Sequence, residues 1–252
     1  MIPYLSTDRA TLHHGDALRV LHHQEDVGTL VDATITDPPY SSGGLHRSDR
    51  NRDTVTKYVT GGGPRADYMP QFAGDNRDQR AYGAWLGIVL AACFRISRPG
   101  ALCAVFTDWR QVAVTVDAIQ VGGFTYRGLQ PWLKPKGAAR PRAGGYWDAG
   151  EFVVWGTAGA TDAGTDPLFG AGYVEARSPR DKVHVAEKPS EVCDWLMSVV
   201  RPGSLVLDPF AGSGAIGVAA LRRGCRALLV EGEEVHCRTI SGRLAPATFG
   251  AT

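Results

Sequence analysis

The stretch "LVLDPFAGSGAIGVAAL" (residues 205–221) constrains the fold most, because it has the pattern of a strand, a tight turn and a helix. Gly212 and Gly214 allow the backbone to turn sharply and to approach a ligand closely. Asp208 ends the strand, and another acid, Glu231, ends the next strand 23 residues later. An acid at about this distance after a glycine turn is typical of ribose binding. The stretch therefore predicts a parallel strand whose carboxyl end binds a nucleoside-bearing cofactor.

Strand-like and helix-like segments alternate along the rest of the chain. Strands are expected at 10–18, 31–37, 101–108, 124–134, 151–157, 204–210 and 226–232, and helices at 17–24, 79–97, 109–123, 189–200, 215–224 and 233–245. This alternation predicts an α/β fold with a mostly parallel sheet and helices on both faces. The neighbouring strands at 124–134 and 151–157 predict one antiparallel edge strand. We expect one domain over residues 1–252, with loop insertions at 41–80 and 157–183 as candidate segments for DNA recognition.

The charge and cysteine patterns narrow the class of protein. The formal net charge is +1, so a nucleic-acid surface must be local rather than global. The five cysteines form no CxxC pair, which indicates reduced thiols rather than zinc ligands or disulfides. No apolar run reaches about 18 residues and no basic-then-apolar leader opens the chain, so we expect a cytoplasmic protein without a membrane span. The histidines lack a matching carboxylate or cysteine cluster, so no metal site is expected.

The acid at position 208 selects among nucleoside cofactors. A carboxylate beside the glycine turn would repel a pyrophosphate, because like charges repel. It suits a cationic ligand better, such as the ammonium group of a methionine moiety. The sequence therefore favours S-adenosylmethionine over NAD. The alternative is a tight turn that binds no ligand.

A second feature, "TDPPY" (residues 36–40), ends another strand with a stiff corner. Asp37 offers a carboxylate, and the Pro38 carbonyl offers a second acceptor held by the proline ring. Two such acceptors can bind the hydrogens of an exocyclic amino group on a base and direct its lone pair toward a methyl donor. Tyr40 can stack on a base taken out of the duplex. The alternative is an ordinary strand-ending turn, since Asp and Pro are common in turns.

Together, "TDPPY" and "LDPFAGSG" resemble the catalytic and cofactor motifs of the amino-group DNA methyltransferases, the N6-adenine and N4-cytosine enzymes. The catalytic motif comes first, as in the permuted β group of that family, and "HVAEKPSEVCDWLM" resembles its His-x-x-x-Lys-Pro segment. The resemblance implies the Rossmann-like fold of S-adenosylmethionine-dependent methyltransferases. It implies base-binding residues Asp37, Pro38, Pro39 and Tyr40, and cofactor-binding residues Asp16, Lys188, Asp208, Phe210, Gly212, Gly214 and Glu231. Lys188 would border the carboxylate side of the cofactor, and the alternative is a solvated residue before a helix.

A local basic segment, residues 127–147, interleaves positive charges with aromatic rings and contains no acid. Basic side chains bind phosphates and aromatic rings stack on bases, so this segment is the candidate contact with double-stranded DNA. Its basic residues are Arg127, Lys134, Lys136, Arg140 and Arg142, and its aromatic residues are Trp132, Tyr146 and Trp147. The alternative is a solvated loop whose aromatic residues belong to the core.

Within the family, aspartate before the two prolines is typical of the adenine enzymes and serine of the cytosine enzymes. The sequence therefore predicts a site-specific enzyme that methylates N6 of an adenine flipped into the Asp-Pro-Pro-Tyr pocket. N4-cytosine methylation is the near alternative. More distant alternatives are methylation of RNA or of a protein glutamine, or an inactive DNA-binding relative. The resemblance also allows a homodimer.

Overall fold

The computed structural model describes residues 1–40, 77–135, 144–146, 149–161, 167–179 and 187–245. These residues build one nine-stranded sheet with the strand order β1-β2-β9-β8-β3-β4-β6-β5-β7. Its strands are β1 (Leu5–Ser6), β2 (Ala10–His14), β3 (Val31–Thr36), β4 (Ser97–Thr107), β5 (Thr125–Leu133), β6 (Gly150–Thr157), β7 (Val174–Glu175), β8 (Leu205–Asp208) and β9 (Arg226–Glu231).

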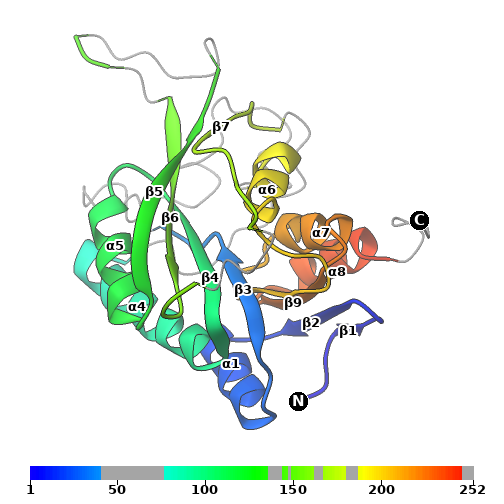
Figure 1. Ribbon diagram of the computed structural model, residues 1–252. Helices are drawn as coiled ribbons and strands as arrows, with labels where there is room; N and C mark the ends of the chain where they lie inside the picture. The colour runs from blue at the N-terminus through cyan, green and yellow to red at the C-terminus, as the bar shows by residue number, and fades with distance from the viewer. Residues whose placement is uncertain (41–76, 136–143, 147–148, 162–166, 180–186, 246–252) are drawn as a thin grey trace.

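Helices cover both faces of the sheet, as the alternating pattern predicts (Figure 1). They are α1 (Ala17–Asp26), α4 (Gln79–Arg95), α5 (Val112–Val121), α6 (Ser190–Met197), α7 (Ala215–Arg222) and α8 (Glu234–Arg243). One apolar core joins α1, α4 and α5 to one face, and a second joins α6, α7 and α8 to the other. The central strands therefore contribute buried side chains to both cores, which explains their continuous apolar runs.

Strand directions follow the prediction, with one difference in position. The ladders β2–β9, β9–β8, β8–β3 and β3–β4 are all parallel. The expected antiparallel strand is β6, but it lies between β4 and β5 rather than at the edge. Because β6 reverses direction, β5 again runs parallel to β4. The amino end of β6 therefore lies beside the carboxyl ends of its neighbours β4 and β5. The short β1 supplies an antiparallel edge on the opposite side.

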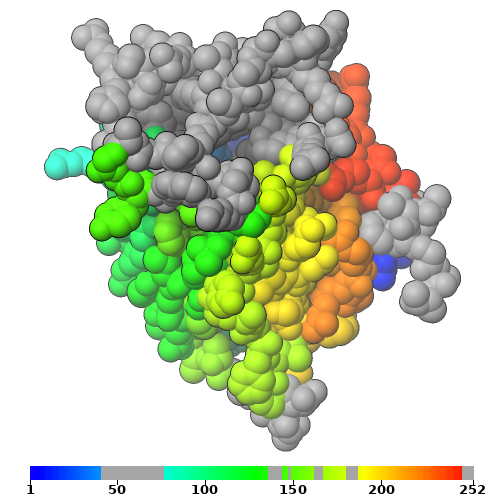
Figure 2. Space-filling model, turned by 90° about the horizontal axis from the view of Figure 1, so that it is seen from above, coloured from blue at the N-terminus to red at the C-terminus, as the bar shows by residue number. Residues whose placement is uncertain are grey.

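The chain leaves β3 and β8 in opposite directions. After β3 it crosses α4 to β4, and after β8 it crosses α7 to β9 on the other side. The neighbouring carboxyl ends of β3 and β8 therefore form the switch point where ligands bind in open α/β sheets. Figure 2 looks onto the molecule from this edge, with the yellow atoms of α6 between the green strand region and the orange atoms of α7.

Two further findings concern the described residues as a whole. None of the helices within them combines the length and the apolar character needed to cross a lipid bilayer. All five cysteines carry free thiols and are buried.

Candidate active site

The corner after β3 lies beside the glycine turn after β8, although 172 residues separate them in sequence. The Thr36 hydroxyl donates a hydrogen bond to Oδ1 of Asp208 over 2.8 Å and so ties the two strand ends together. Pro38 is buried and Pro39 is half-buried. The two motifs therefore face one switch point, where a base and a cofactor can meet.

Both carboxylate oxygens of Asp37 have a partner. Lys188 Nζ donates to Oδ2 over 2.6 Å, and the Tyr40 hydroxyl donates to Oδ1. Burial raises the pKa of Asp37, and the neighbouring ammonium and hydroxyl groups oppose that rise. Burial and the adjacent carboxylate also raise the pKa of Tyr40 well above its ordinary value, so its hydroxyl remains a donor.

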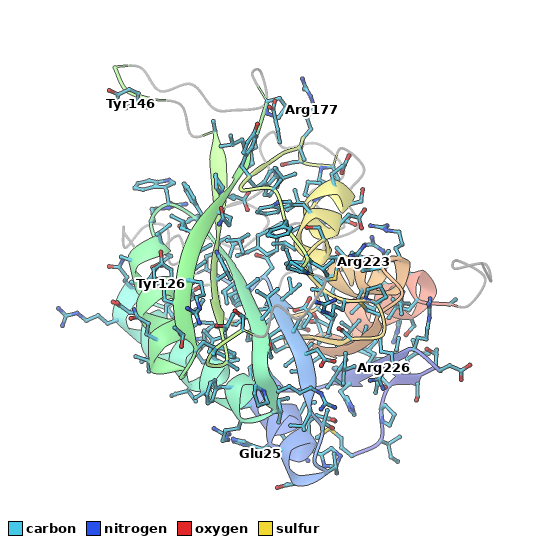
Figure 3. All side chains as sticks on the ribbon, viewed as in Figure 1. Glu25, Tyr126, Tyr146, Arg177, Arg223 and Arg226 are labelled. Atoms are coloured by element: carbon cyan, nitrogen blue, oxygen red, sulfur yellow. The ribbon has the colours of Figure 1, made fainter. Side chains whose placement is uncertain are left out.

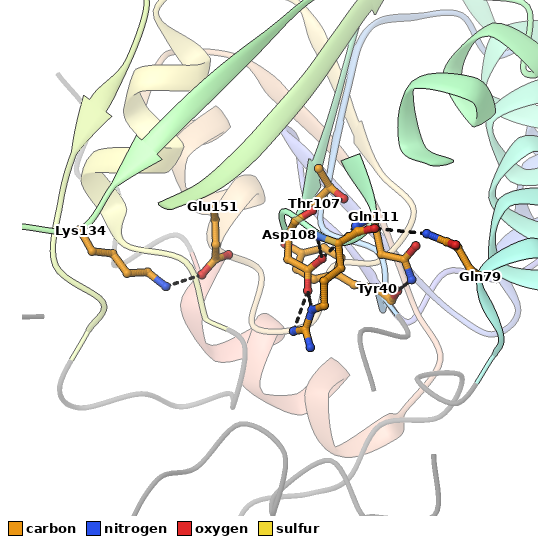
Figure 4. A network of polar contacts seen from close by, with 8 residues as sticks. Tyr40, Gln79, Thr107, Asp108, Gln111, Lys134 and Glu151 are labelled. Carbon is orange, nitrogen blue, oxygen red and sulfur yellow. Dashed lines mark hydrogen bonds and ion pairs between the residues drawn. The ribbon is translucent and has the colours of Figure 1, made fainter. Parts of the chain in front are cut away.

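A second carboxylate lies on the other side of Lys188. Glu151, at the start of β6, places Oε2 3.5 Å from Lys188 Nζ, while Lys134 Nζ contacts Oε1 over 2.8 Å (Figure 4). Burial acts to raise the pKa of Glu151, but the two lysines outweigh it and lower that pKa. Burial acts to lower the pKa of Lys188, but Asp37 and Glu151 outweigh it and raise that pKa. Both shifts favour the charged forms of Glu151 and Lys188.

The turn after β4 also contacts the corner that contains Asp37 and Tyr40 (Figure 4). Gln111 is buried, and its amide donates to the Tyr40 carbonyl oxygen over 3.0 Å. Asp108 accepts the backbone N–H groups of Arg110 and Gln111 and forms an ion pair with the Arg110 guanidinium at 2.9 Å. The backbone around Tyr40 is thus held by a second polar cluster.

The glycine turn is closed by a buried acid. Glu231 accepts the Gly212 N–H over 2.7 Å and the Glu233 N–H over 2.8 Å. A carboxylate offers about four acceptor positions, so capacity remains beyond these two bonds for ligand hydroxyls. Gly214 has a φ of 77°, a left-handed conformation that side chains other than glycine rarely adopt. The Phe210 ring packs on Trp85 of α4 with the ring centroids 5.2 Å apart.

We expect Gly214→Ala to destabilise the protein by about 1–3 kcal/mol, because alanine is strained at this φ. Its Cβ would also lie 3.1 Å from Ile240 Cγ1. Gly242→Ala is the matched control, since its Cβ meets nothing within 4 Å and it lies in α8. Urea unfolding measures both variants, and equal midpoints would contradict the expectation.

Asp208 is almost fully buried, at 2% exposure. Burial raises its pKa to about 7, although the Thr36 hydroxyl and the Phe210 N–H, 3.1 Å from Oδ1, oppose the rise. The negative charge of this acid is therefore costly unless a cation approaches it. A cationic ligand at the glycine turn would supply that compensation.

Two of the residues assigned to the cofactor have other partners in the structure. Asp16 lies at the carboxyl end of β2, next to the end of β9, and its side chain caps α1 by accepting the Arg19 N–H over 3.0 Å. Lys188 is only 8% exposed and contacts Asp37 and Glu151. It is therefore not a solvated residue, and it lies against the Asp-Pro-Pro-Tyr corner.

The structure divides the basic segment. Lys134 lies at the carboxyl-end edge of the sheet, whereas Arg127 lies at the opposite edge, bonded to Thr157 Oγ1 over 3.0 Å and to the Gly159 carbonyl. The prediction that groups Arg127 with the site is therefore not supported by its position. Trp132 is a core residue, with 2% exposure and its indole N–H donated to the Ala176 carbonyl. Tyr146 is 95% exposed, at the outer end of the β5–β6 hairpin (Figure 3). Lys136, Arg140, Arg142 and Trp147 lie outside the described residues.

The sequence analysis missed Glu151 and Gln111. Glu151 opens a strand, and only a correct placement of the antiparallel β6 would have brought it to the site. Gln111 follows the carboxyl end of β4 by four residues, a position from which polar residues commonly reach a site at a parallel sheet edge. Among the described residues, no group of three His, Cys, Asp or Glu side chains is arranged to hold a metal ion.

Comparison with known proteins adds a family match. Residues 166–242 match the model of a family described as DNA methylase. The chain is also 28% identical, over 232 residues, to "Putative methylase YubD" from Escherichia coli K12, which covers 92% of this chain and 88% of that protein.

Solved structures share the fold. The complex of M1.HpyAVI with SAM superposes with a TM-score of 0.66 at 20% identity, covering 94% of this chain and 99% of that one. The PvuII DNA methyltransferase, described as cytosine-N4-specific, superposes with a TM-score of 0.65 at 14% identity, covering 96% and 88%. At these identities the two likenesses show the fold, which is confirmed as that of the S-adenosylmethionine-dependent methyltransferases. With the family match, they confirm the resemblance to the amino-group DNA methyltransferases.

Proposed function

We propose that this chain is an amino-group DNA methyltransferase that uses S-adenosylmethionine. The premise is that residues 166–242 match the DNA methylase family and that the chain has a methyltransferase fold. Its acceptor in this proposal is the N6 amino group of adenine. The observation that carries the proposal is the contact between the two motifs, through the Thr36–Asp208 hydrogen bond of 2.8 Å. In this proposal, the contact brings Asp37, the acceptor for the amino group, beside the glycine turn that binds the nucleoside.

The base-binding corner supplies positioning. Asp37 Oδ2 or Oδ1 accepts one hydrogen of the target amino group, and the Pro38 carbonyl oxygen accepts the other. The lone pair, otherwise delocalised into the base, is then directed toward the methyl donor. Correct placement of reacting groups can account for several kcal/mol of a barrier, on the order of 7–11 in favourable cases. The proton that the nitrogen loses leaves through the Asp37 carboxylate to solvent.

The residues at the glycine turn fit the cofactor. When bound, S-adenosylmethionine supplies an electrophilic methyl group on a positively charged sulfur. Asp208 would face the positive methionine end, and its burial without an ion pair to any described residue supports this assignment. Glu231 retains acceptor positions for the ribose hydroxyls beyond its two backbone bonds. Gly212 and Gly214 would allow the backbone to approach, and Phe210 would line the pocket against Trp85.

Double-stranded DNA is the partner in this proposal. The target base leaves the stack and enters the corner, where Tyr40 offers an aromatic surface. Lys134, directly after the carboxyl end of β5, and the exposed ring of Tyr146 lie on the edge that the DNA would approach. Arg127 is left out of this surface, because it lies at the opposite ends of the strands, beside Thr157 and Gly159.

The choice of adenine rests on Asp37, since the resemblance associates aspartate before two prolines with adenine enzymes. The fold likeness to a cytosine-N4-specific enzyme keeps N4-cytosine as the second candidate. The two products have different masses and chromatographic positions as nucleosides, so one measurement separates them.

We expect the purified protein to transfer labelled methyl groups to unmethylated plasmid DNA, with N6-methyl-2′-deoxyadenosine as the product in the nucleoside digest. The digest is analysed by mass spectrometry, and the modified sites are then mapped by sequencing. N4-methyl-2′-deoxycytidine in the digest would make cytosine, rather than adenine, the target base in the proposal. Label found in RNA or protein but not in DNA would refute the DNA assignment.

A further inference from the structure

Lys188 lies between two half-buried carboxylates that belong to different parts of the fold. Asp37 follows β3, Glu151 is the second residue of β6, and Lys188 precedes α6. Nζ of Lys188 is 2.6 Å from Asp37 and 3.5 Å from Glu151. The side chain of Lys188 is 8% exposed and those of Asp37 and Glu151 are 18% and 20% exposed, so water screens these charges little.

In the proposed reaction an oxygen of Asp37 accepts a hydrogen of the target amino group, and in this structure Lys188 and Tyr40 each hold an acceptor position on this carboxylate. An amino group that takes the position held by Lys188 must displace the ammonium. Displacing a buried ammonium into a site without an acceptor would cost several kcal/mol. Glu151 removes that difficulty, because it offers a second carboxylate within reach of the same ammonium.

The aromatic surroundings also favour a mobile ammonium. The ring centroids of Phe106 and Tyr40 lie 5.1 and 5.3 Å from Lys188 Nζ. Cation–π attraction is not directed at a single oxygen, so it persists when the ammonium shifts between the carboxylates. Lys134 binds the other oxygen of Glu151 over 2.8 Å and keeps that side chain in place.

We propose that Lys188 occupies the amino-group position on Asp37 in the free protein and moves to Glu151 when the target base enters. This inference rests on the proposed function of the corner. Glu151 is then a positioning residue, because it acts through Lys188 and does not touch the base. No proton is transferred in the step, so the net charge of the cluster does not change.

The test is steady-state methyl transfer to plasmid DNA at saturating cofactor by the wild type, Glu151→Gln and Glu151→Asp. Without a second carboxylate, Lys188 stays on Asp37 and opposes entry of the base. Glu151→Gln should lower kcat by about 10- to 100-fold, the range expected for one charge-assisted hydrogen bond. We expect KM for DNA and the Kd for cofactor to stay within about threefold. Glu151→Asp should recover most of the loss, because the charge is kept.

Two controls separate this mechanism from a loss of structure. Glu175→Gln removes an exposed carboxylate on β7 at the same sheet edge and should behave as the wild type. In a Lys188→Gln background, Glu151→Gln should cause no further loss, because its effect passes through Lys188.

The outcomes are distinguishable. A wild type that methylates DNA together with an unchanged Glu151→Gln variant overturns the role of Glu151 alone. Full additivity of the two substitutions also overturns it. A wild type that transfers no methyl group to DNA refutes the proposed function and this inference with it. A loss in Glu151→Gln that Glu151→Asp does not reverse would mark a merely structural role.

Discussion

Asp37→Ala is expected to lower methyl transfer to DNA by about 100- to 1,000-fold, the usual cost of removing one preorganised group at a reacting centre. The substitution removes an acceptor for the target amino group, so the lone pair is no longer directed toward the methyl donor. The protein should remain folded, because Lys188 keeps Glu151 as a counter-ion in the variant. Labelled methyl transfer to plasmid DNA measures the effect.

Cofactor affinity, measured by calorimetry, should survive in Asp37→Ala because the glycine turn on β8 supplies separate contacts. Asp117→Ala is the control, since this acid is exposed on α5, away from the switch point. Full activity of Asp37→Ala would refute the role of the carboxylate. A thousandfold loss of cofactor affinity with normal transfer at saturation would move Asp37 from the base to the cofactor.

Asp208 should make the protein less stable as the pH rises from about 4 to about 7. Burial raises its folded pKa to about 7, above the ordinary value of an aspartate in the unfolded chain. The folded state then holds a proton that the unfolded state releases, so this stabilisation is complete below pH 4 and is lost as pH rises through 7. The whole effect is on the order of 4 kcal/mol, at about 1.4 kcal/mol for each tenfold change.

Asp208→Asn isolates this contribution from the other groups that titrate in the same range. Its amide oxygen can accept the bonds from Thr36 and Phe210, and its N–H group resembles the O–H group of the protonated acid. Urea unfolding of both proteins between pH 4 and pH 8, without cofactor, gives the difference in free energy of unfolding. As the pH rises, the free energy of unfolding of Asp208→Asn should increase relative to that of the wild type. Parallel curves for the two proteins would refute the raised pKa of Asp208.

The fold was largely predictable because its elements are signalled locally. The glycine turn at 212–214, the buried runs of β3 and β8 and the amphipathic helices all lie where the pattern places them. Since parallel strands end at one edge, the meeting of Asp37 with the glycine turn also followed. The two-residue strands β1 and β7 were missed, because so short a segment has no period to detect.

The charged cluster was less predictable, because it depends on strand order. The position of Glu151 near Asp37 follows only if β6 lies antiparallel beside β4. Arg127 and Lys134 are close in sequence, yet the strand between them spans roughly 20 Å and separates them to opposite edges. Lys188 contacts both Asp37 and Glu151, which only the strand order brings together. Its assignment to the cofactor could therefore not be checked from the sequence.

The base of the β5–β6 hairpin has an evolutionary consequence. The Lys134 N–H donates to the Ala149 carbonyl over 2.6 Å, so the chain leaves the sheet and returns to it at one closed point. Lengthening a connection costs only about 0.6 kcal/mol per doubling of its length. Insertions or substitutions beyond this point would not change the register of the strand ladder that contains Glu151. On the proposed function, a target preference set beyond this point could diverge, or be engineered by grafting, independently of the residues at the switch point.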